Sequence, residues 1–157
     1  MTAYLTSLGP DDLRPLNISE PWTFGVADRV RFYELDALGH VNHATYLKWF
    51  ETVRVSWFGD YGLSRYGPED PTFVLKRVEC DYIAPMFLHD SYVVTARASS
   101  FRTSSFTKEY GVWRAGALVA KGACIVVMTD KSGTQKVPLT AAMRDVLSTR
   151  DGAGPAG

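Results

Sequence analysis

The sequence predicts an α+β fold in which an antiparallel sheet of about five strands wraps around one long central helix. Helical spacing of apolar residues is clear over residues 43–58, and this segment is too apolar for an ordinary surface helix. From residue 72 onward, strand-like segments follow one another through turns short enough for hairpins. With 157 residues and 46% hydrophobic content, the chain has the size of one domain with a packed core. A helix with so many apolar residues must be buried on most sides, and the predicted strands can form the sheet that buries it.

Composition argues against several classes of function. The 17 lysines and arginines balance the 17 aspartates and glutamates, so we expect neither nucleic-acid binding nor attraction to an acidic membrane surface. We also expect no membrane span and no signal peptide, because apolar runs of the necessary length and pattern are missing. Cys80 and Cys124 lie in apolar strand-like runs without the spacing of zinc ligands. These features predict a cytoplasmic protein with two buried, reduced thiols.

The first part of the chain is expected to lead through one strand and a loop into the central helix. Residues 1–21 show no sustained periodicity and contain several prolines, which predicts an extended lead-in. Residues 24–33 combine β-branched and aromatic residues with charges, as a first strand does. After a short loop, Asn42 is a suitable N-cap, and the helix is expected to run from His43 to about Phe58.

Four further strands are expected after a loop rich in glycine and proline at residues 59–71. In the first of them apolar and charged residues alternate, with Lys76 as the exception. The last is apolar on both faces, as a central strand or a strand at a subunit interface would be. A short helix over residues 138–148 completes a domain of residues 22–149, and a disordered tail of residues 150–157 is expected after it. The predicted strands are Thr72–Ile83, Tyr92–Ser99, Phe106–Arg114 and Leu118–Thr129.

One loop carries the residues best suited to chemistry. It contains Asp36, followed by Gly39, which permits a tight backbone path, and it ends where the helix begins at His43. The first amides of a helix lack partners within the helix and carry the positive end of its dipole, so they stabilise an oxyanion placed there. The loop therefore offers an acid beside an oxyanion hole. Taken alone, an aspartate before a helix is more often a cap or a solvated loop residue.

The stretch from Arg31 to Arg54 also carries a longer pattern, which consists of Asp36, Gly39, His40-Val41-Asn42-His43, Tyr46, Phe50-Glu51 and Arg54. In residue type and spacing it resembles the 4-hydroxybenzoyl-CoA thioesterase type of hotdog-fold acyl-CoA thioesterases. The resemblance implies the hotdog fold, whose order of elements the prediction follows to about residue 148. It also implies hydrolysis of acyl-CoA without cofactor or metal. In this family two protomers pair their sheets, which implies a homodimer or homotetramer with the acyl-CoA site between protomers.

The resemblance implies roles for three residues. Asp36 would act on the thioester as a nucleophile, forming a mixed anhydride, or as a general base on water. The backbone amide of His43 would hold the thioester oxygen. Thioesterases of the Tol-Pal-associated type also use the histidine side chain, together with a tyrosine where this chain has Phe32, so a part for the imidazole stays open. Glu51 would form an ion pair with Arg54 or support the active site.

For coenzyme A, the resemblance points to the hairpin at residues 102–106. The family approaches the pantetheine and the nucleotide phosphates there with basic and hydroxyl side chains, which makes Arg102, Ser104 and Ser105 the candidates. An ordinary polar turn is the alternative interpretation. No metal is expected, because the histidines near Asp36 lack the spacing of a metal site.

Two other functions remain open at this point. A hotdog dehydratase or hydratase places Asp and His five positions apart, or uses a histidine with a downstream glycine and proline, and Asp36 and His43 fit neither pattern. A non-catalytic acyl-CoA or acyl-carrier binding protein would have no need of Asp36 with Gly39 at a helix start. The identity of the acyl group is open as well, because the depth of the acyl pocket depends on how the partner's strands meet Trp49, Phe58 and Phe73.

Overall fold

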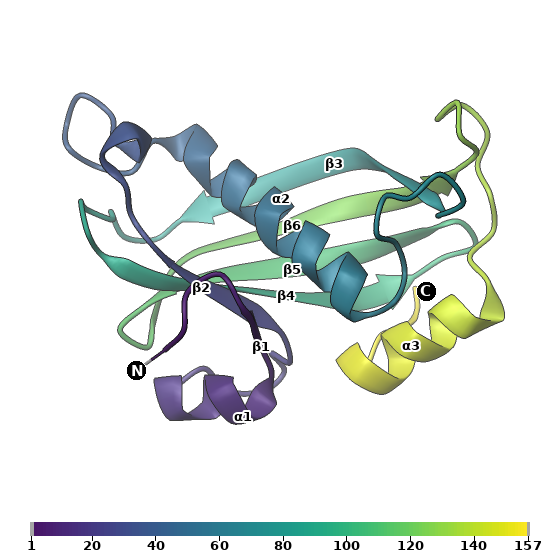
Figure 1. Cartoon of the computed structure of the whole chain (residues 1–157), viewed down its shortest axis with the longest axis horizontal. Coiled ribbons are helices and arrows are strands. Elements are labelled where there is room, and N and C mark those ends of the chain that lie inside the picture. Colours follow the sequence, from purple (N-terminus) through teal and green to yellow (C-terminus); the bar gives the residue numbers. More distant parts are fainter. Residues whose placement is uncertain (1, 157) are drawn as a thin grey trace.

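The fold is an antiparallel sheet curled around one long helix, α2, as the sequence predicts (Figure 1). The computed structural model describes residues 2–156. The strands are β1 (Ser7–Leu8), β2 (Gly25–Arg29), β3 (Thr72–Tyr82), β4 (Ser91–Phe101), β5 (Ser105–Arg114), β6 (Ala117–Thr129) and β7 (Gly154–Pro155). The helices are α1 (Pro10–Leu13), α2 (His43–Asp60) and α3 (Ala141–Asp151), with 3-10 turns at Arg14–Leu16 and Phe32–Glu34.

The strands follow the order β1-β2-β4-β5-β6-β3, and neighbours in this order are antiparallel. The predicted hairpins are confirmed, and the one between β5 and β6 turns through Ala115 and Gly116 at φ values of 50° and 78°. Positive φ at both central residues is what a tight type I′ hairpin requires. Strand β6, predicted to be central or to lie at a subunit interface, lies between β5 and β3. Its two apolar faces are thus those of a central strand, and β3 forms an edge of the sheet.

Large aromatic residues hold helix α2 in the sheet. Phe50 and Trp57 are fully buried, and Phe50 stacks on Tyr110 of β5 with ring centroids 4.5 Å apart. Strand β6 approaches the helix at Gly122, where a Cβ would overlap the Phe50 ring, so that only glycine fits. The helix continues to Asp60, slightly past its predicted end. Each buried aromatic ring removes a large apolar area from water, which makes this contact the main part of the core.

The N-terminal residues are not the extended lead-in that was predicted for residues 1–21. From residue 2 onward they include β1, α1 and a 3-10 turn, so the prediction is wrong. Leu13 and Ile18 are buried in a second hydrophobic cluster together with Ala27 and Val93. The strand neighbours of Ala27 and Val93 belong to the main core, so this cluster lies on the other face of the sheet. Elements of two to four residues are too short for periodicity to reveal them.

The C-terminal segment is ordered as well. Helix α3 runs over Ala141–Asp151, later at both ends than predicted, and β7 then pairs in parallel with the end of β4. The N–H of Ala156 donates to the carbonyl oxygen of Phe101 at 2.8 Å. The predicted disorder of residues 150–157 is therefore wrong for all but the last residue, which lies outside the described part. A stretch of glycine, alanine and proline can be ordered when its backbone forms hydrogen bonds with another strand. Such pairing cannot be predicted from the composition of the stretch.

One lysine lies completely inside the core. Lys108 of β5 has 0% of its surface exposed, and among the described residues its Nζ has no hydrogen-bond partner. The Nζ lies over the Trp57 ring, 3.2 Å from its centroid. Burial lowers the pKa of Lys108 well below its ordinary value of 10.5, and the charge of Asp151 acts in the opposite direction. Lys108 therefore releases its proton more easily in the folded protein than in the unfolded chain.

We expect Lys108→Met to stabilise the protein at neutral pH, because methionine fills similar space without a group that titrates. Between the lowered pKa of Lys108 in the folded protein and its ordinary value of 10.5, the unfolded chain binds more protons at this position than the folded protein does. Over that range the contribution of Lys108 makes the wild-type protein more stable as the pH rises. The gain of the variant, about 1 kcal/mol or more at pH 7, should shrink as the pH approaches 10.5. Urea unfolding at several pH values measures this, with exposed Lys121→Met as the control. A variant less stable than wild type at every pH would contradict the interpretation.

Candidate functional site

The loop that carries Asp36 is a tight turn between β2 and α2. Strand β2 ends at Arg29, earlier than predicted, and the 3-10 turn at Phe32–Glu34 follows. The N–H of Asp36 donates to the carbonyl oxygen of His40 at 2.7 Å, and the N–H of Gly39 donates to the carbonyl oxygen of Asp36 at 3.1 Å. Gly39 has a φ of 76°, which glycine adopts without strain. These bonds fix the backbone from which the Asp36 side chain projects.

The Asp36 carboxylate is held at one oxygen and unengaged at the other. The residue is half-buried, and its Oδ1 accepts hydrogen bonds from the N–H of Leu38 at 2.8 Å and the N–H of His40 at 3.1 Å. Within residues 2–156 no hydrogen bond is made to Oδ2. A carboxylate that two backbone amides orient, with one oxygen unengaged, can attack a carbonyl carbon or accept a proton from water.

The start of α2 has the predicted cap. Asn42 Oδ1 accepts from the N–H of Ala44 at 2.9 Å. The N–H of His43, the first of the helix, has no acceptor in the described part of the chain, while the His43 imidazole is exposed. The hydroxyl of Tyr82, at the end of β3, donates to the carbonyl oxygen of His43 at 2.7 Å. The helix start therefore presents an unengaged N–H and is held to the sheet edge by a tyrosine that was not predicted to take part.

Glu34 joins the loop to the helix, although the sequence did not single it out. Its buried carboxylate accepts from Trp49 Nε1 at 3.0 Å and from the N–H of Arg31 at 2.8 Å. Its backbone carbonyl oxygen accepts from the N–H of Asn42 at 2.8 Å. Glutamates in polar segments are usually solvated, so the sequence holds no local signal for this burial. The contacts keep the loop of Asp36 beside the start of α2.

Glu51 lies on the same helix but away from its start. Eight residues separate it from His43, which corresponds to about 12 Å along the helix axis. Its side chain is 72% exposed and forms a 3.8 Å ion pair with Arg54, the simpler of the two predicted roles. Arg54 is buried and donates to the hydroxyl of Tyr110 at 3.0 Å. Glu51 and Arg54 line a cavity of about 300 Å³ between α2 and β3.

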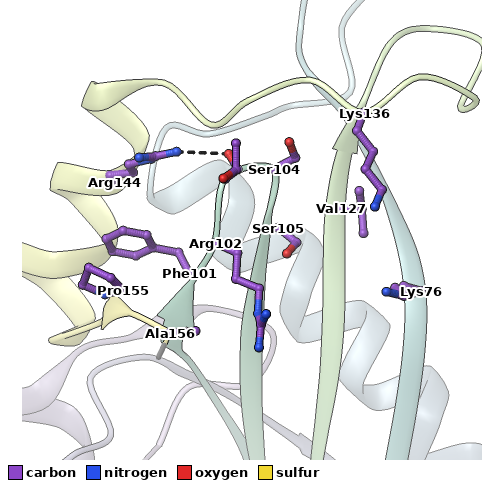
Figure 2. A pocket seen from close by; sticks show the side chains of 11 residues that line it. Lys76, Phe101, Arg102, Ser104, Ser105, Val127, Lys136, Arg144, Pro155 and Ala156 are labelled. Atoms are coloured by element: carbon purple, nitrogen blue, oxygen red, sulfur yellow. Dashed lines mark hydrogen bonds between the residues drawn. The ribbon is translucent and has the colours of Figure 1, made fainter.

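The three residues predicted to contact coenzyme A line one cavity of about 660 Å³ (Figure 2). Arg102, Ser104 and Ser105 come from the hairpin between β4 and β5. Three more basic residues, which the sequence did not assign to this site, line the same cavity: Lys76, Lys136 and Arg144. Four cations around one hollow favour a ligand with several negative charges.

Lys76 reaches this cavity because strand β3 is irregular there. The pairing of β3 with β6 shifts register between Leu75 and Arg77, as it does at a β-bulge. A bulge changes the direction in which a side chain points. The interruption of the alternating pattern at Lys76 was thus a visible signal of this residue's different orientation.

Arg144 brings helix α3 to the same cavity. Its Nη2 donates to the carbonyl oxygen of Thr103 at 3.1 Å, and its buried Nε has no partner among the described residues. Figure 2 shows the Arg144 side chain on the side of α3, across the hairpin from Lys76 on β3. Both sides of the hollow are therefore basic.

The structure also bears on the predictions about the two cysteines, a metal site and a membrane span. Cys124 is buried as predicted, whereas Cys80 on the edge strand β3 is partly exposed, and both are free thiols. In the described part of the chain, no group of three or more His, Cys, Asp or Glu side chains is arranged to hold a metal ion. None of the helices within residues 2–156 has both the length and the apolar character that a membrane span needs.

An antiparallel sheet curled around one long helix defines a hotdog-fold protein. The model of the thioesterase-like superfamily matches residues 30–147, and the chain belongs to this family. The family and the fold predicted from the stretch Arg31–Arg54 are thereby confirmed.

Similar proteins agree with this assignment. A thioesterase superfamily structure from Jannaschia sp. CCS1 is 44% identical, with a TM-score of 0.94 over 99% of this chain and 100% of that one. A Thermus thermophilus thioesterase, solved in complex with coenzyme A and zinc, is 32% identical, with a TM-score of 0.73 over 85% of this chain and 98% of that one. An uncharacterized Bacillus subtilis protein is 29% identical over 75% of this chain and 80% of its own length.

Proposed function

We propose that the protein is an acyl-CoA thioesterase, which hydrolyses an acyl-CoA to the free acid and coenzyme A. The observation that carries this proposal is the unengaged Oδ2 of Asp36 in a loop that leads directly to the unengaged N–H of His43. An acid and an oxyanion donor suffice for a thioester, because the thiolate is a good leaving group. Membership of the thioesterase-like superfamily supports the same reaction. As proposed, the reaction uses no cofactor or metal.

In the proposed mechanism the thioester oxygen accepts a hydrogen bond from the N–H of His43. If Asp36 is the nucleophile, its Oδ2 bonds to the carbonyl carbon, the coenzyme A thiolate leaves, and water hydrolyses the mixed anhydride. If Asp36 is a general base, it takes a proton from the water that adds to the carbonyl carbon, and the thiolate then leaves. The thiolate acquires a proton in both routes, and neither requires the His43 imidazole or Glu51.

Strand β3 connects the two parts of the proposed site. Both Tyr82 and Lys76 belong to this strand. The Tyr82 hydroxyl contacts the first residue of α2, and Lys76 lines the basic cavity. Six residues of strand correspond to about 20 Å, so a ligand that reaches both places must be long and charged at one end. Coenzyme A has this form, with its sulfur and its phosphates at opposite ends of the pantetheine arm. We therefore place its phosphates among Lys76, Arg102, Lys136 and Arg144.

We also propose that two copies of the chain pair along β3. This strand is a sheet edge, and its side chains Leu75 and Val78 are exposed at 44% and 38%. Three apolar residues near the Asp36 loop, Phe32, Tyr33 and Leu38, are each 78% exposed. An unpaired strand edge next to exposed apolar groups is a surface suited to pairing with another chain. A second copy would cover the edge and complete the site.

The first prediction is that Asp36→Asn lowers turnover of acyl-CoA by about a hundredfold or more while binding changes little, because the amide can neither attack nor accept the proton. Thiol release and melting temperature are measured on the same preparation. Glu51→Gln is the matched control and should keep most of the turnover, since Glu51 forms an exposed ion pair. Near-native turnover by folded Asp36→Asn would remove the mechanism. Wild-type protein that binds acyl-CoA without releasing thiol would favour a binding protein instead.

The second prediction is that Arg102→Ala and Lys76→Ala each raise the Michaelis constant for acyl-CoA about tenfold, with a smaller effect on turnover. A phosphate contact is present in both the ground state and the transition state, so its loss weakens binding rather than the chemical step. Acyl-pantetheine, which lacks the nucleotide, should be unaffected. Lys121→Ala, an exposed change outside the cavity, serves as the control. Equal penalties with both substrates would place the nucleotide elsewhere.

The third prediction concerns assembly. Light scattering at assay concentrations should give the mass of a dimer or a tetramer of the chain, and Val78→Lys should shift it toward the monomer, because a charge would be buried at the proposed interface. Turnover should fall with dissociation. A wild-type monomer that hydrolyses acyl-CoA at full rate would contradict a site completed by a second copy.

A further inference from the structure

The C-terminal segment, residues 139–156, forms one wall of the basic cavity. Arg144 on α3, Pro155 of β7 and Ala156 line it. The segment lies beside the end of the sheet and near the C-terminal end of α2 (Figure 1). The shape of the cavity therefore depends on how this short segment is held against the rest of the protein.

One buried carboxylate accepts four of the hydrogen bonds that attach the segment. Asp151, the last residue of α3, is 4% exposed. Its Oδ1 accepts from the hydroxyl of Thr23 at 2.8 Å and from the hydroxyl of Tyr61. Its Oδ2 accepts from the N–H of Ala98 at 2.7 Å and from Trp57 Nε1 at 3.2 Å. The donors belong to the segment before β2 (Thr23), to strand β4 (Ala98) and to the C-terminal end of α2 (Trp57 and Tyr61), so one side chain joins α3 to three separate places.

Apolar contacts also attach this segment to the core. Leu139, Leu147 and Ala153 are buried in the main core, and Met143 and Val146 pack against it while partly exposed. Apolar contacts alone permit sliding, whereas four hydrogen bonds to one carboxylate have fixed directions and a single arrangement that satisfies them all. Arg144 lies seven residues before Asp151 on the same helix, about two turns away. A rigid helix anchored at Asp151 therefore contributes to the position of Arg144, whose Nη2 also donates to the carbonyl oxygen of Thr103.

We propose that Asp151 is a positioning residue for coenzyme A: by anchoring α3 and β7, it keeps Arg144 and the chain at Pro155–Ala156 in place as a wall of the nucleotide cavity. The inference rests on the proposed function, because it takes the cavity to be the coenzyme A site. Asp151 itself touches neither the ligand nor the reacting atoms. Its effect is on the binding of the nucleotide and not on the cleavage of the thioester.

The test is the variant Asp151→Asn, whose amide group cannot accept from all four donors. The Michaelis constant for acyl-CoA should rise about tenfold, while kcat and the hydrolysis of acyl-pantetheine change less than about twofold. Hydrogen exchange should be faster across residues 141–156, and the strands β5 and β6 should keep their protection. The control is Asp60→Asn, which breaks the exposed 2.9 Å ion pair with Arg150 at the same end of α3 and should leave the Michaelis constant unchanged.

A second variant covers the case in which Asp151→Asn does not fold. Thr23→Val removes one of the four donors and leaves the carboxylate in place, so it should raise the Michaelis constant for acyl-CoA in the same direction by a smaller factor. Faster exchange in the segment with an unchanged Michaelis constant, in either variant, would overturn the positioning role. If instead the Michaelis constant for acyl-CoA is the same for wild type and Arg102→Ala, the nucleotide does not bind in this cavity. The positioning role of Asp151 is then wrong as well.

Discussion

The structure depends on the burial of helix α2 by the curled sheet. The helix presents large aromatic rings, among them Phe50 and Trp57, and β6 approaches closely enough at Gly122 that no side chain fits there. Apolar burial of this size is the dominant favourable contribution to folding. It also fixes where an amide is available for chemistry, because a helix packed along one side against the sheet still presents the unengaged N–H of His43 at its start. The loop of Asp36 is attached at this end.

Strand β3 has two consequences for function because it is both an edge and a connector. At one end Tyr82 holds the carbonyl oxygen of His43, and further along the strand a bulge directs Lys76 into the basic cavity. The same strand leaves its outer edge free for another chain. A single element thus relates the start of α2, the proposed coenzyme site and the proposed subunit contact, so a change in the path of β3 would affect all three.

Buried charged groups orient the parts that the apolar core leaves free. Glu34 ties the loop of Asp36 to α2, and Asp151 ties the C-terminal segment to the sheet, each through several directed hydrogen bonds. Such groups are costly to bury and add orientation more than stability. Lys108 is the exception, because among the described residues it has no hydrogen-bond partner and rests on the Trp57 ring. Its burial is a local cost that the surrounding aromatic packing offsets.

Features that arise between residues close in the chain could be predicted from the sequence. The cap at Asn42, the loop of Asp36, the central helix and the hairpins follow from local spacing and turn chemistry, and the family is recognisable from one continuous stretch. Three other features became visible in the folded chain: the burial of Glu34, the ordered C-terminal segment and the basic residues that surround the cavity at Arg102. These depend on partners distant in sequence, as in the hydrogen bond between the N–H of Ala98 and Asp151, and no local pattern encodes which distant groups will meet.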